Sequence, residues 1–250
     1  MTTALIGYTG FVGYNIMCHS NTHMDLYNRT NIRDIYNKKY DLVICAAPKG
    51  SMYIANKFPD DDLGDIYSLI KHLNLIDTKK LILISTTEVY ANKNFINEDD
   101  KTDTQLNSYG KNRNFLENTL LVRDDIHIIR LPILVGDKLK KNFIYDLING
   151  GSSEFVHMNS VFQFYDLANI WTDINKVIDM NLDVINFVSE PIPANDIARD
   201  IFDVILHNIT SERRTSNILS KYSHHWDSVP KYLYTKEQIY TSIKHYKGLR

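Results

Sequence analysis

The decapeptide ALIGYTGFVG at residues 4–13 decides how the rest of the chain folds. Its apolar start indicates a short β-strand, and glycine then recurs at every third position before an apolar helix face with Val12, Ile16 and Met17. The N-terminus of such a helix offers unpaired N–H groups and the positive end of its dipole, which suit phosphate groups. We therefore predict a nucleotide-binding turn at the beginning of the chain.

The three glycines of this turn have different expected roles. Gly7 permits the tight turn, Gly10 lets the backbone approach a pyrophosphate, and Gly13 lets the helix pack closely on the strand. A glycine pattern alone also suits an ordinary turn or a helix cap, but here the required strand and helix flank it. The residues that we expect to contact a bound dinucleotide in this turn are Gly7, Tyr8, Gly10, Phe11, Val12 and Gly13.

Apolar runs and amphipathic segments alternate through the first half of the chain, a pattern typical of a doubly wound parallel sheet. Further strands are expected at residues 24–28, 41–47, 80–85, 126–132 and 184–188, and helices at 53–58, 63–75, 108–121, 195–207 and 236–246. Right-handed crossovers place the carboxyl ends of the strands on one edge. Those ends are Gly7, Ala46, Thr86 and Leu131, so candidate site residues should converge there.

We predict an α/β fold, a Rossmann-type doubly wound parallel sheet with a small C-terminal substrate lobe. The dinucleotide-binding domain is expected at residues 1–135, with residues 160–190 returning to it. Residues 136–159 and 191–250 are then left for the substrate lobe. Asp60, Asp61 and Asp62 are expected to cap the helix that we predict from Leu63, since acidic residues suit a helix N-terminus better than a metal site on diverging side chains.

Composition excludes several classes of protein. A formal net charge of -2 gives no electrostatic reason to expect a nucleic acid or a membrane as partner. No apolar run is long enough to span a bilayer, and the two cysteines, Cys18 and Cys45, suit small buried side chains in a reducing compartment. Adjacent His224 and His225 diverge and have no further ligand at metal spacing. We expect a cytoplasmic protein without a metal site.

The ends of the second and third predicted strands bear on the choice of cofactor. Asn28 and Arg29 end the second strand without an acidic residue, which favours NADP over NAD, although Arg29 also suits a solvated loop. The third strand ends in the small residues Ala46, Ala47 and Pro48, which would let a cofactor lie against the backbone. We therefore add these five residues to the predicted cofactor site.

Four motifs, in order and at matching spacing, resemble the extended short-chain dehydrogenase/reductase superfamily, which includes nucleotide-sugar epimerases, dehydratases and reductases. They are the glycine turn, STTEVY at residues 85–90, Tyr109 with a basic residue four positions later, and RLP at 130–132. Residues 164–168 and 186–191 also resemble later segments of that superfamily, so the resemblance covers nearly the whole chain.

The resemblance implies a catalytic role for Tyr109, which would exchange a proton with a substrate hydroxyl while hydride moves to or from the nicotinamide. Thr86 would hold the same substrate oxygen, and Glu88 matches the Thr-x-Glu of members that act next to a transient ketone. Arg113 stands where the superfamily has lysine. Its guanidinium can still reach the cofactor ribose and lower the pKa of the phenol, but it cannot readily relay a proton.

Leu131 and Pro132 complete the cofactor site that the resemblance implies, at the end of the fifth strand. The function expected is that of an NAD(P)-dependent oxidoreductase, epimerase or dehydratase acting on a nucleotide sugar through a transient keto intermediate. Two alternatives stay open: a dinucleotide-binding protein in which Arg113 marks weakened catalysis, and a reductase of a non-sugar carbonyl. Relatives pair through two long helices, which predicts a homodimer through residues 63–75 and 108–121.

Overall fold

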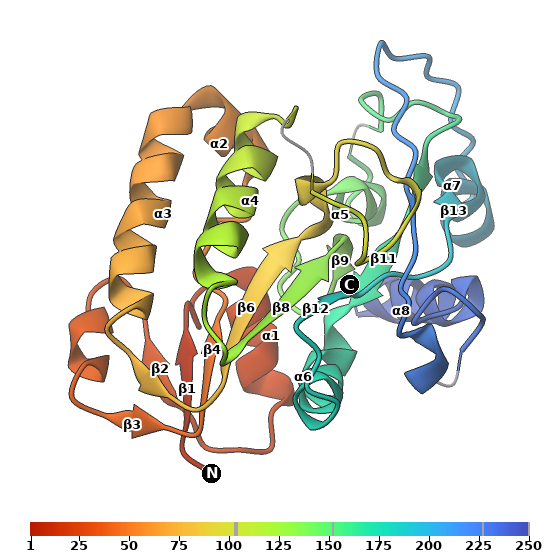
Figure 1. Cartoon of the computed structure of the whole chain (residues 1–250). Helices are drawn as coiled ribbons and strands as arrows, with labels where there is room; N and C mark the ends of the chain where they lie inside the picture. The colour runs from red at the N-terminus through yellow and green to blue at the C-terminus, as the bar shows by residue number, and fades with distance from the viewer. Residues whose placement is uncertain (103–104, 152, 227, 250) are drawn as a thin grey trace. The chain divides into compact units, whose positions relative to one another are not determined.

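A computed structural model describes residues 1–102, 105–151, 153–226 and 228–249 of the chain (Figure 1). Its central sheet has six strands, in the spatial order β12 (Val184–Asn186), β8 (Ile126–Leu131), β6 (Leu81–Thr86), β4 (Leu42–Cys45), β1 (Thr3–Ile6) and β2 (Asp25–Tyr27). The pairs β1–β2, β1–β4 and β4–β6 are parallel. The predicted α/β fold with a Rossmann-type parallel sheet is confirmed.

The strand order reverses at β1, which lies between β2 and β4. In open α/β sheets a ligand binds outside the carboxyl ends of the strands at such a reversal. Ile6 and Cys45, the last residues of β1 and β4, are paired in register. The turns that follow these two strands therefore start side by side, where a ligand is expected.

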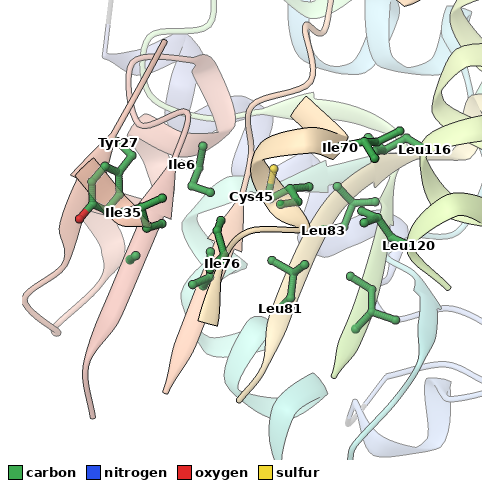
Figure 2. Packing of buried hydrophobic residues seen from close by; sticks show 14 of the residues in the cluster. Ile6, Tyr27, Ile35, Cys45, Ile70, Ile76, Leu81, Leu83, Leu116 and Leu120 are labelled. Atoms are coloured by element: carbon green, nitrogen blue, oxygen red, sulfur yellow. The ribbon is translucent and has the colours of Figure 1, made fainter. Parts of the chain in front are cut away.

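Helices cover both faces of this sheet. α3 (Pro59–Leu73) and α4 (Ser108–Leu120) pack on one face, and α1 (Phe11–His19) packs beside α6 (Ile170–Asp179), whose Trp171 Nε1 donates to Asn21 Oδ1 at 3.0 Å. Figure 2 shows the apolar core under α3 and α4, in which Ile70, Leu116 and Leu120 meet Cys45, Leu81 and Leu83 of the strands. The shorter elements of this part are α2 (Met52–Lys57), β3 (Lys39–Tyr40) and β5 (Asp77–Thr78).

α3 begins four residues earlier than predicted, so the expected aspartate cap at Leu63 is wrong. Pro59 is the first residue of the helix, and no side chain caps it. Proline suits this position because the missing N–H would have no partner there. The three aspartates lie inside the first turn, where their charge complements the helix dipole. Asp62 is buried.

The two cysteines differ in exposure. Cys45 is buried in β4, as predicted, whereas Cys18 is exposed and its predicted burial is wrong. α1 turns Gly13 and Ile16 inward, and Cys18 falls on its outer side because of the helical repeat. Among the described residues, no helix is both long enough and apolar enough to cross a membrane.

The chain divides into two compact units. The first comprises Met1–Ala91, Lys101–Arg130 and Ala168–Ile185, and the second comprises Asn92–Asp100, Leu131–Leu167 and Asn186–Arg250. The predicted assignment of residues 1–135 and 160–190 to cofactor binding, and of 136–159 and 191–250 to a substrate lobe, stays a prediction.

In its described residues, the second unit has short paired strands and three α-helices. Its strand pairs are β7 (Asn94–Ile96) with β14 (Asn217–Ile218), β9 (Ile133–Val135) with β11 (Phe164–Asp166), and β10 (Val161–Phe162) with β13 (Ile192–Pro193). Its helices are α5 (Phe143–Ile148), α7 (Ala194–Phe202) and α8 (Lys236–Gly248). The Glu98 carboxylate joins distant segments of this unit, since it accepts hydrogen bonds from Asn186 N, Ser220 Oγ and Lys221 N.

Candidate active site

The turn after β1 has a shape that requires glycine. Gly7 has a φ of +89°, and a Cβ atom there would lie 2.7 Å from the backbone of Ala46. A Cβ atom at Gly13 would lie only 2.2 Å from the Gly7 carbonyl oxygen. At Gly10 the corresponding distance to the same oxygen is 3.3 Å, so this position is less constrained by the protein itself. The close approach of turn, helix and β4 is therefore the reason for two of the three glycines.

The N-terminus of α1 has no side-chain cap among the described residues, because Gly10 occupies the N-cap position. Its first N–H groups and the positive end of the helix dipole are thus left for an anion. Phe11 and Val12 form the first turn of the helix, and the Tyr8 hydroxyl accepts a hydrogen bond from Asn28 Nδ2 at 3.2 Å. This arrangement is a cradle that leaves backbone N–H groups available to an anion, as predicted for a pyrophosphate site.

At the end of β2, Asn28 and Arg29 have different partners. Asn28 Oδ1 accepts from the backbone N–H and the hydroxyl of Thr30, at 2.8 and 2.7 Å. Arg29 is largely exposed and pairs with Asp65 of α3 at 3.1 Å, and Lys49 pairs with the same carboxylate at 2.5 Å. Two cations therefore lie at this end of the cradle, and the predicted preference for NADP stays a prediction.

The loop that leaves β4 connects the glycine turn to α4. Ala46 lies against Gly7, and three residues later the Lys49 carbonyl oxygen accepts a hydrogen bond from Arg113 Nη2 at 2.5 Å. Pro48 and Ala47 lie between these two contacts in the sequence. The predicted cofactor turn and the predicted catalytic helix are thereby joined through one short segment of the first unit.

Tyr109 lies in the first turn of α4, which begins close to the end of β6 (Figure 1). A Cβ atom at Gly110 would lie 2.3 Å from the carbonyl oxygen of Glu88, so only glycine allows this approach. The Thr86 hydroxyl accepts from the Glu88 backbone N–H at 3.1 Å, and it also forms a hydrogen bond with Tyr109. The structure therefore brings together Tyr109, Thr86 and Glu88, three of the four predicted catalytic residues.

Arg113, the fourth predicted catalytic residue, is buried one helical turn after Tyr109. Its Cζ lies 4.2 Å from the centre of the Tyr109 ring, and its Nη1 pairs with the Asp62 carboxylate of α3. Its Nε is buried without a hydrogen-bond partner in the described part of the chain. Lys111, two residues before Arg113, is exposed on α4.

Several groups act on the pKa of the Tyr109 hydroxyl. Burial raises the pKa of its hydroxyl, the Arg113 charge and the Thr86 hydrogen bond lower it, and the charges of Glu88 and Asp62 raise it. The net direction is upward, and the expected lowering by the Arg113 charge is present as one of the contributions. Desolvation of a half-buried phenol outweighs the cation next to it.

A buried ionic network lies further along the same face of α4. Arg130 Nη2 donates to Glu117 Oε2 at 2.6 Å, Arg130 Nε donates to Oε2 at 3.0 Å, and the Ser85 hydroxyl donates to Oε1. Arg130 Nη1 also donates to the Tyr90 hydroxyl. Because Ser85 immediately precedes Thr86, this network fixes α4 against the end of β6, where the site is assembled.

Sequence analysis did not single out Asp62, Gly110 or Glu117 as site residues. Tyr109, Arg113 and Glu117 follow one another at four-residue spacing, a signal that places all three on one helix face. Leu131 is buried at the end of β8, and Pro132 follows it in the second unit. Their predicted contact with a cofactor stays a prediction.

Gly110→Ala is expected to destabilise the protein by about 1–3 kcal/mol, because the added methyl group overlaps the backbone of the turn after β6. Urea unfolding measures the change. Gly64→Ala is the matched control, since a Cβ at that exposed position of α3 has nothing within 4 Å. This second variant should be stabilised by roughly 0.5–1 kcal/mol through helix propensity. Equal stability of the two variants would contradict the close approach.

No protein-family model and no curated protein sequence matches the chain. Solved structures do match it. A dTDP-4-dehydrorhamnose reductase from Bacillus anthracis, crystallised with NADP, has a TM-score of 0.79 at 16% identity, over 100% of this chain and 99% of that chain. The chain has the fold of the extended short-chain dehydrogenases/reductases.

Two further matches have the same fold. MoeE5 in complex with UDP-glucose and NAD has a TM-score of 0.77 at 14% identity, and the match covers 100% of both chains. A UDP-glucose 4-epimerase from Thermotoga maritima, solved with UDP-glucose, has a TM-score of 0.72 at 14% identity, again over 100% of both chains. The predicted likeness to the extended short-chain dehydrogenases/reductases is thus confirmed for the fold along the entire chain.

Proposed function

We propose that the protein is an NAD(P)-dependent oxidoreductase, epimerase or dehydratase that acts on a nucleotide sugar through a transient keto intermediate. One observation carries the proposal most strongly. The loop after β4 contacts the glycine turn at Ala46 and the cation beside Tyr109 at Lys49. The same short segment therefore contacts both the dinucleotide cradle and the cation beside Tyr109. This suits a reaction in which hydride transfer and proton transfer act on the same substrate.

The described residues fit a dinucleotide. The uncapped N-terminus of α1 and the turn at Gly7, Gly10 and Gly13 would hold the pyrophosphate, and Arg29 would suit a 2′-phosphate. The Nε of Arg113 is a buried donor without a partner, which fits an acceptor such as a ribose hydroxyl. When bound, the nicotinamide supplies or accepts the hydride.

The side chains around Tyr109 would handle the proton. In the direction of ketone reduction, the Tyr109 hydroxyl donates its proton to the substrate oxygen, and the Thr86 hydroxyl holds that oxygen in place. Arg113 stabilises the phenolate that results, because its positive charge lies over the ring. In the direction of oxidation the phenolate takes the proton back. Glu88 would act as a second acid or base at the carbon next to the ketone.

The neighbouring structures support the substrate class. The Bacillus anthracis protein is a reductase of a dTDP-linked sugar, and both MoeE5 and the Thermotoga maritima epimerase were solved with UDP-glucose. A nucleotide sugar is therefore the first class of substrate to examine. The predicted homodimer through α3 and α4 stays a prediction.

Purified protein with NADPH or NADH should be incubated with dTDP-4-keto sugars, UDP-glucose and UDP-galactose, and products identified by mass spectrometry and NMR. A reduced, epimerised or dehydrated nucleotide sugar is the expected result. Cofactor binding without any product would instead favour a dinucleotide-binding protein that has lost turnover. Conversion only of simple ketones or aldehydes would favour a reductase of non-sugar carbonyls.

Ketone reduction should be nearly independent of pH from 7 to 9. The reaction needs protonated Tyr109, and its pKa is raised by burial above the ordinary value of 10.0, so the acid form persists through this range. The rate should therefore fall only above pH 10. Initial rates at saturating NADPH and substrate measure this profile, and a decline already between pH 7 and 8 would contradict it.

A further inference from the structure

The guanidinium of Arg113 is held by three contacts within the first unit. Nη1 pairs with the Asp62 carboxylate, Nη2 donates to the Lys49 carbonyl oxygen at 2.5 Å, and Cζ lies 4.2 Å from the centre of the Tyr109 ring. The side chain is 2% exposed. The charge therefore has a fixed place over the phenol ring and no access to bulk water.

Asp62 is the counterion of this buried charge. It lies in the first turn of α3, is 6% exposed, and accepts a second hydrogen bond from Asn112 Nδ2 at 2.8 Å. Both of its donors belong to α4. A buried ion pair adds little net stability compared with apolar side chains of the same volume, whereas it does fix the position of its partner. Asp62 is thus better explained by what it does to Arg113 than by the stability it adds.

Arginine is suited to these contacts in a way that lysine is not. A planar guanidinium can donate to two separate acceptors, here a carboxylate and a carbonyl oxygen, while its face lies on an aromatic ring. An ammonium group is a compact charge that can lie over a ring but has no planar face with which to stack on it. The arginine at position 113 is therefore explained together with the aspartate at position 62, which accepts from it.

We propose that Asp62 is a positioning residue that fixes the Arg113 guanidinium on the Tyr109 ring and so sets the ionisation of the phenol. The inference rests on the proposed function, in which Tyr109 exchanges a proton with the substrate. Asp62 itself touches neither substrate nor cofactor in this scheme. It acts through Arg113, and its negative charge also limits how far the cation favours the phenolate.

Charges from several elements face Tyr109. Burial raises its pKa, Arg113 of the same helix and the Thr86 hydrogen bond lower it, and Glu88 and Asp62 raise it. Of the lysines near this helix, Lys57 of α2 lies over the rings of Tyr53 and Phe58, and Lys49 pairs with Asp65 of α3. The ring is therefore flanked by one cation and two carboxylates whose effects have opposite signs.

The test is a direct titration of Tyr109 by NMR, in protein labelled with ¹³C at tyrosine Cζ. The chain has 16 tyrosines, and loss of one signal in Tyr109→Phe assigns the resonance. Arg113→Gln should shift the Tyr109 titration to higher pH, because the ring loses its cation. Asp62→Asn keeps the shape and an acceptor for Arg113 but removes the negative charge, so it should shift the titration to lower pH.

Asp65→Asn is the matched control, since Asp65 lies one helical turn further along α3 and pairs with Arg29 and Lys49. It should leave the Tyr109 titration unchanged. A merely structural Asp62 would give no shift in Asp62→Asn. Asp62→Ala removes the acceptor as well as the charge, so Arg113 is free to leave the ring and the titration should lie at higher pH than in Asp62→Asn. No shift in Asp62→Asn, or equal titrations in Asp62→Asn and Asp62→Ala, overturns the proposal, and so does an unchanged titration in Arg113→Gln.

Asp62→Asn may be replaced by a second comparison if the variant does not fold. Asp62→Glu, which keeps the charge and the acceptor but lengthens the side chain by one methylene, is then compared with the unmodified protein. A shifted Tyr109 titration supports the proposal, because the guanidinium moves with its acceptor, and an unchanged titration overturns it. The measurement needs neither cofactor nor substrate. A protein that turns over no nucleotide sugar would contradict the proposed function while leaving this result intact.

Discussion

Tyr109→Phe is expected to lower the turnover of a nucleotide sugar by roughly 10²- to 10⁴-fold, the usual loss when a general acid or base is removed. The substitution deletes only the hydroxyl that would exchange a proton with the substrate. The ring stays, and with it the surface on which the Arg113 guanidinium lies. The affinity for NADPH, measured by its fluorescence, should therefore change little, and the loss should appear in kcat.

Tyr67→Phe is the matched control for this experiment. Tyr67 lies on α3 with 48% of its surface exposed, and its ring contacts Phe115 edge-on, a contact that phenylalanine preserves. Its turnover should equal that of the unmodified protein. Unchanged turnover in Tyr109→Phe would show that the Tyr109 hydroxyl does not exchange a proton with the substrate. A parallel loss of NADPH affinity would show instead that the hydroxyl serves binding.

Glu117→Gln is expected to destabilise the protein by about 3–5 kcal/mol, the usual effect of removing one partner from a buried ion pair. Glu117 is 1% exposed and Arg130 is 5% exposed, so the arginine would keep its charge without a counterion or water. Glutamine has the right shape but can accept fewer hydrogen bonds than the carboxylate. For a chain of this size the thermal midpoint should fall by roughly 6–20 °C.

Two comparisons make this second prediction specific. Asp77→Asn breaks the exposed pair between Lys39 and Asp77 and should cost less than about 1 kcal/mol. Glu117→Leu combined with Arg130→Met removes both buried charges and should recover much of the lost stability. Thermal and urea unfolding of the three variants measure these differences. A thermal midpoint for Glu117→Gln equal to that of the unmodified protein would contradict the buried ion pair.

The sheet and its glycine turn could be predicted from the sequence because their signals are local. An apolar run marks each central strand, and the spacing of Gly7, Gly10 and Gly13 reflects contacts within one strand–turn–helix unit. The predicted start of α3, Leu63, lies too late because the apolar stripe begins only after the first turn of the helix. Pro59 can occupy the first position of a helix, and α3 begins there. The exposure of Cys18 could not be inferred from its residue type alone.

The site could be predicted only where one stretch of sequence carries its own signal. Tyr109, Thr86 and Glu88 lie in recognisable motifs, and the structure places them together. Asp62 is 51 residues from Arg113, and no local pattern relates the two. The rise that burial causes in the pKa of Tyr109 has no local signal either, because desolvation depends on all the segments that surround the ring.

The anchor of Arg113 on the loop after β4 is a main-chain oxygen, that of Lys49. Every amino acid provides this acceptor, proline included, so exchange of the side chain at position 49 leaves the anchor in place. The length of the loop, in contrast, sets the distance between this anchor and the glycine turn. One residue inserted or deleted between Ala46 and Lys49 would shift Arg113 relative to the turn that we propose holds the dinucleotide, so we expect natural variants of this chain to differ there in residue type but not in residue number.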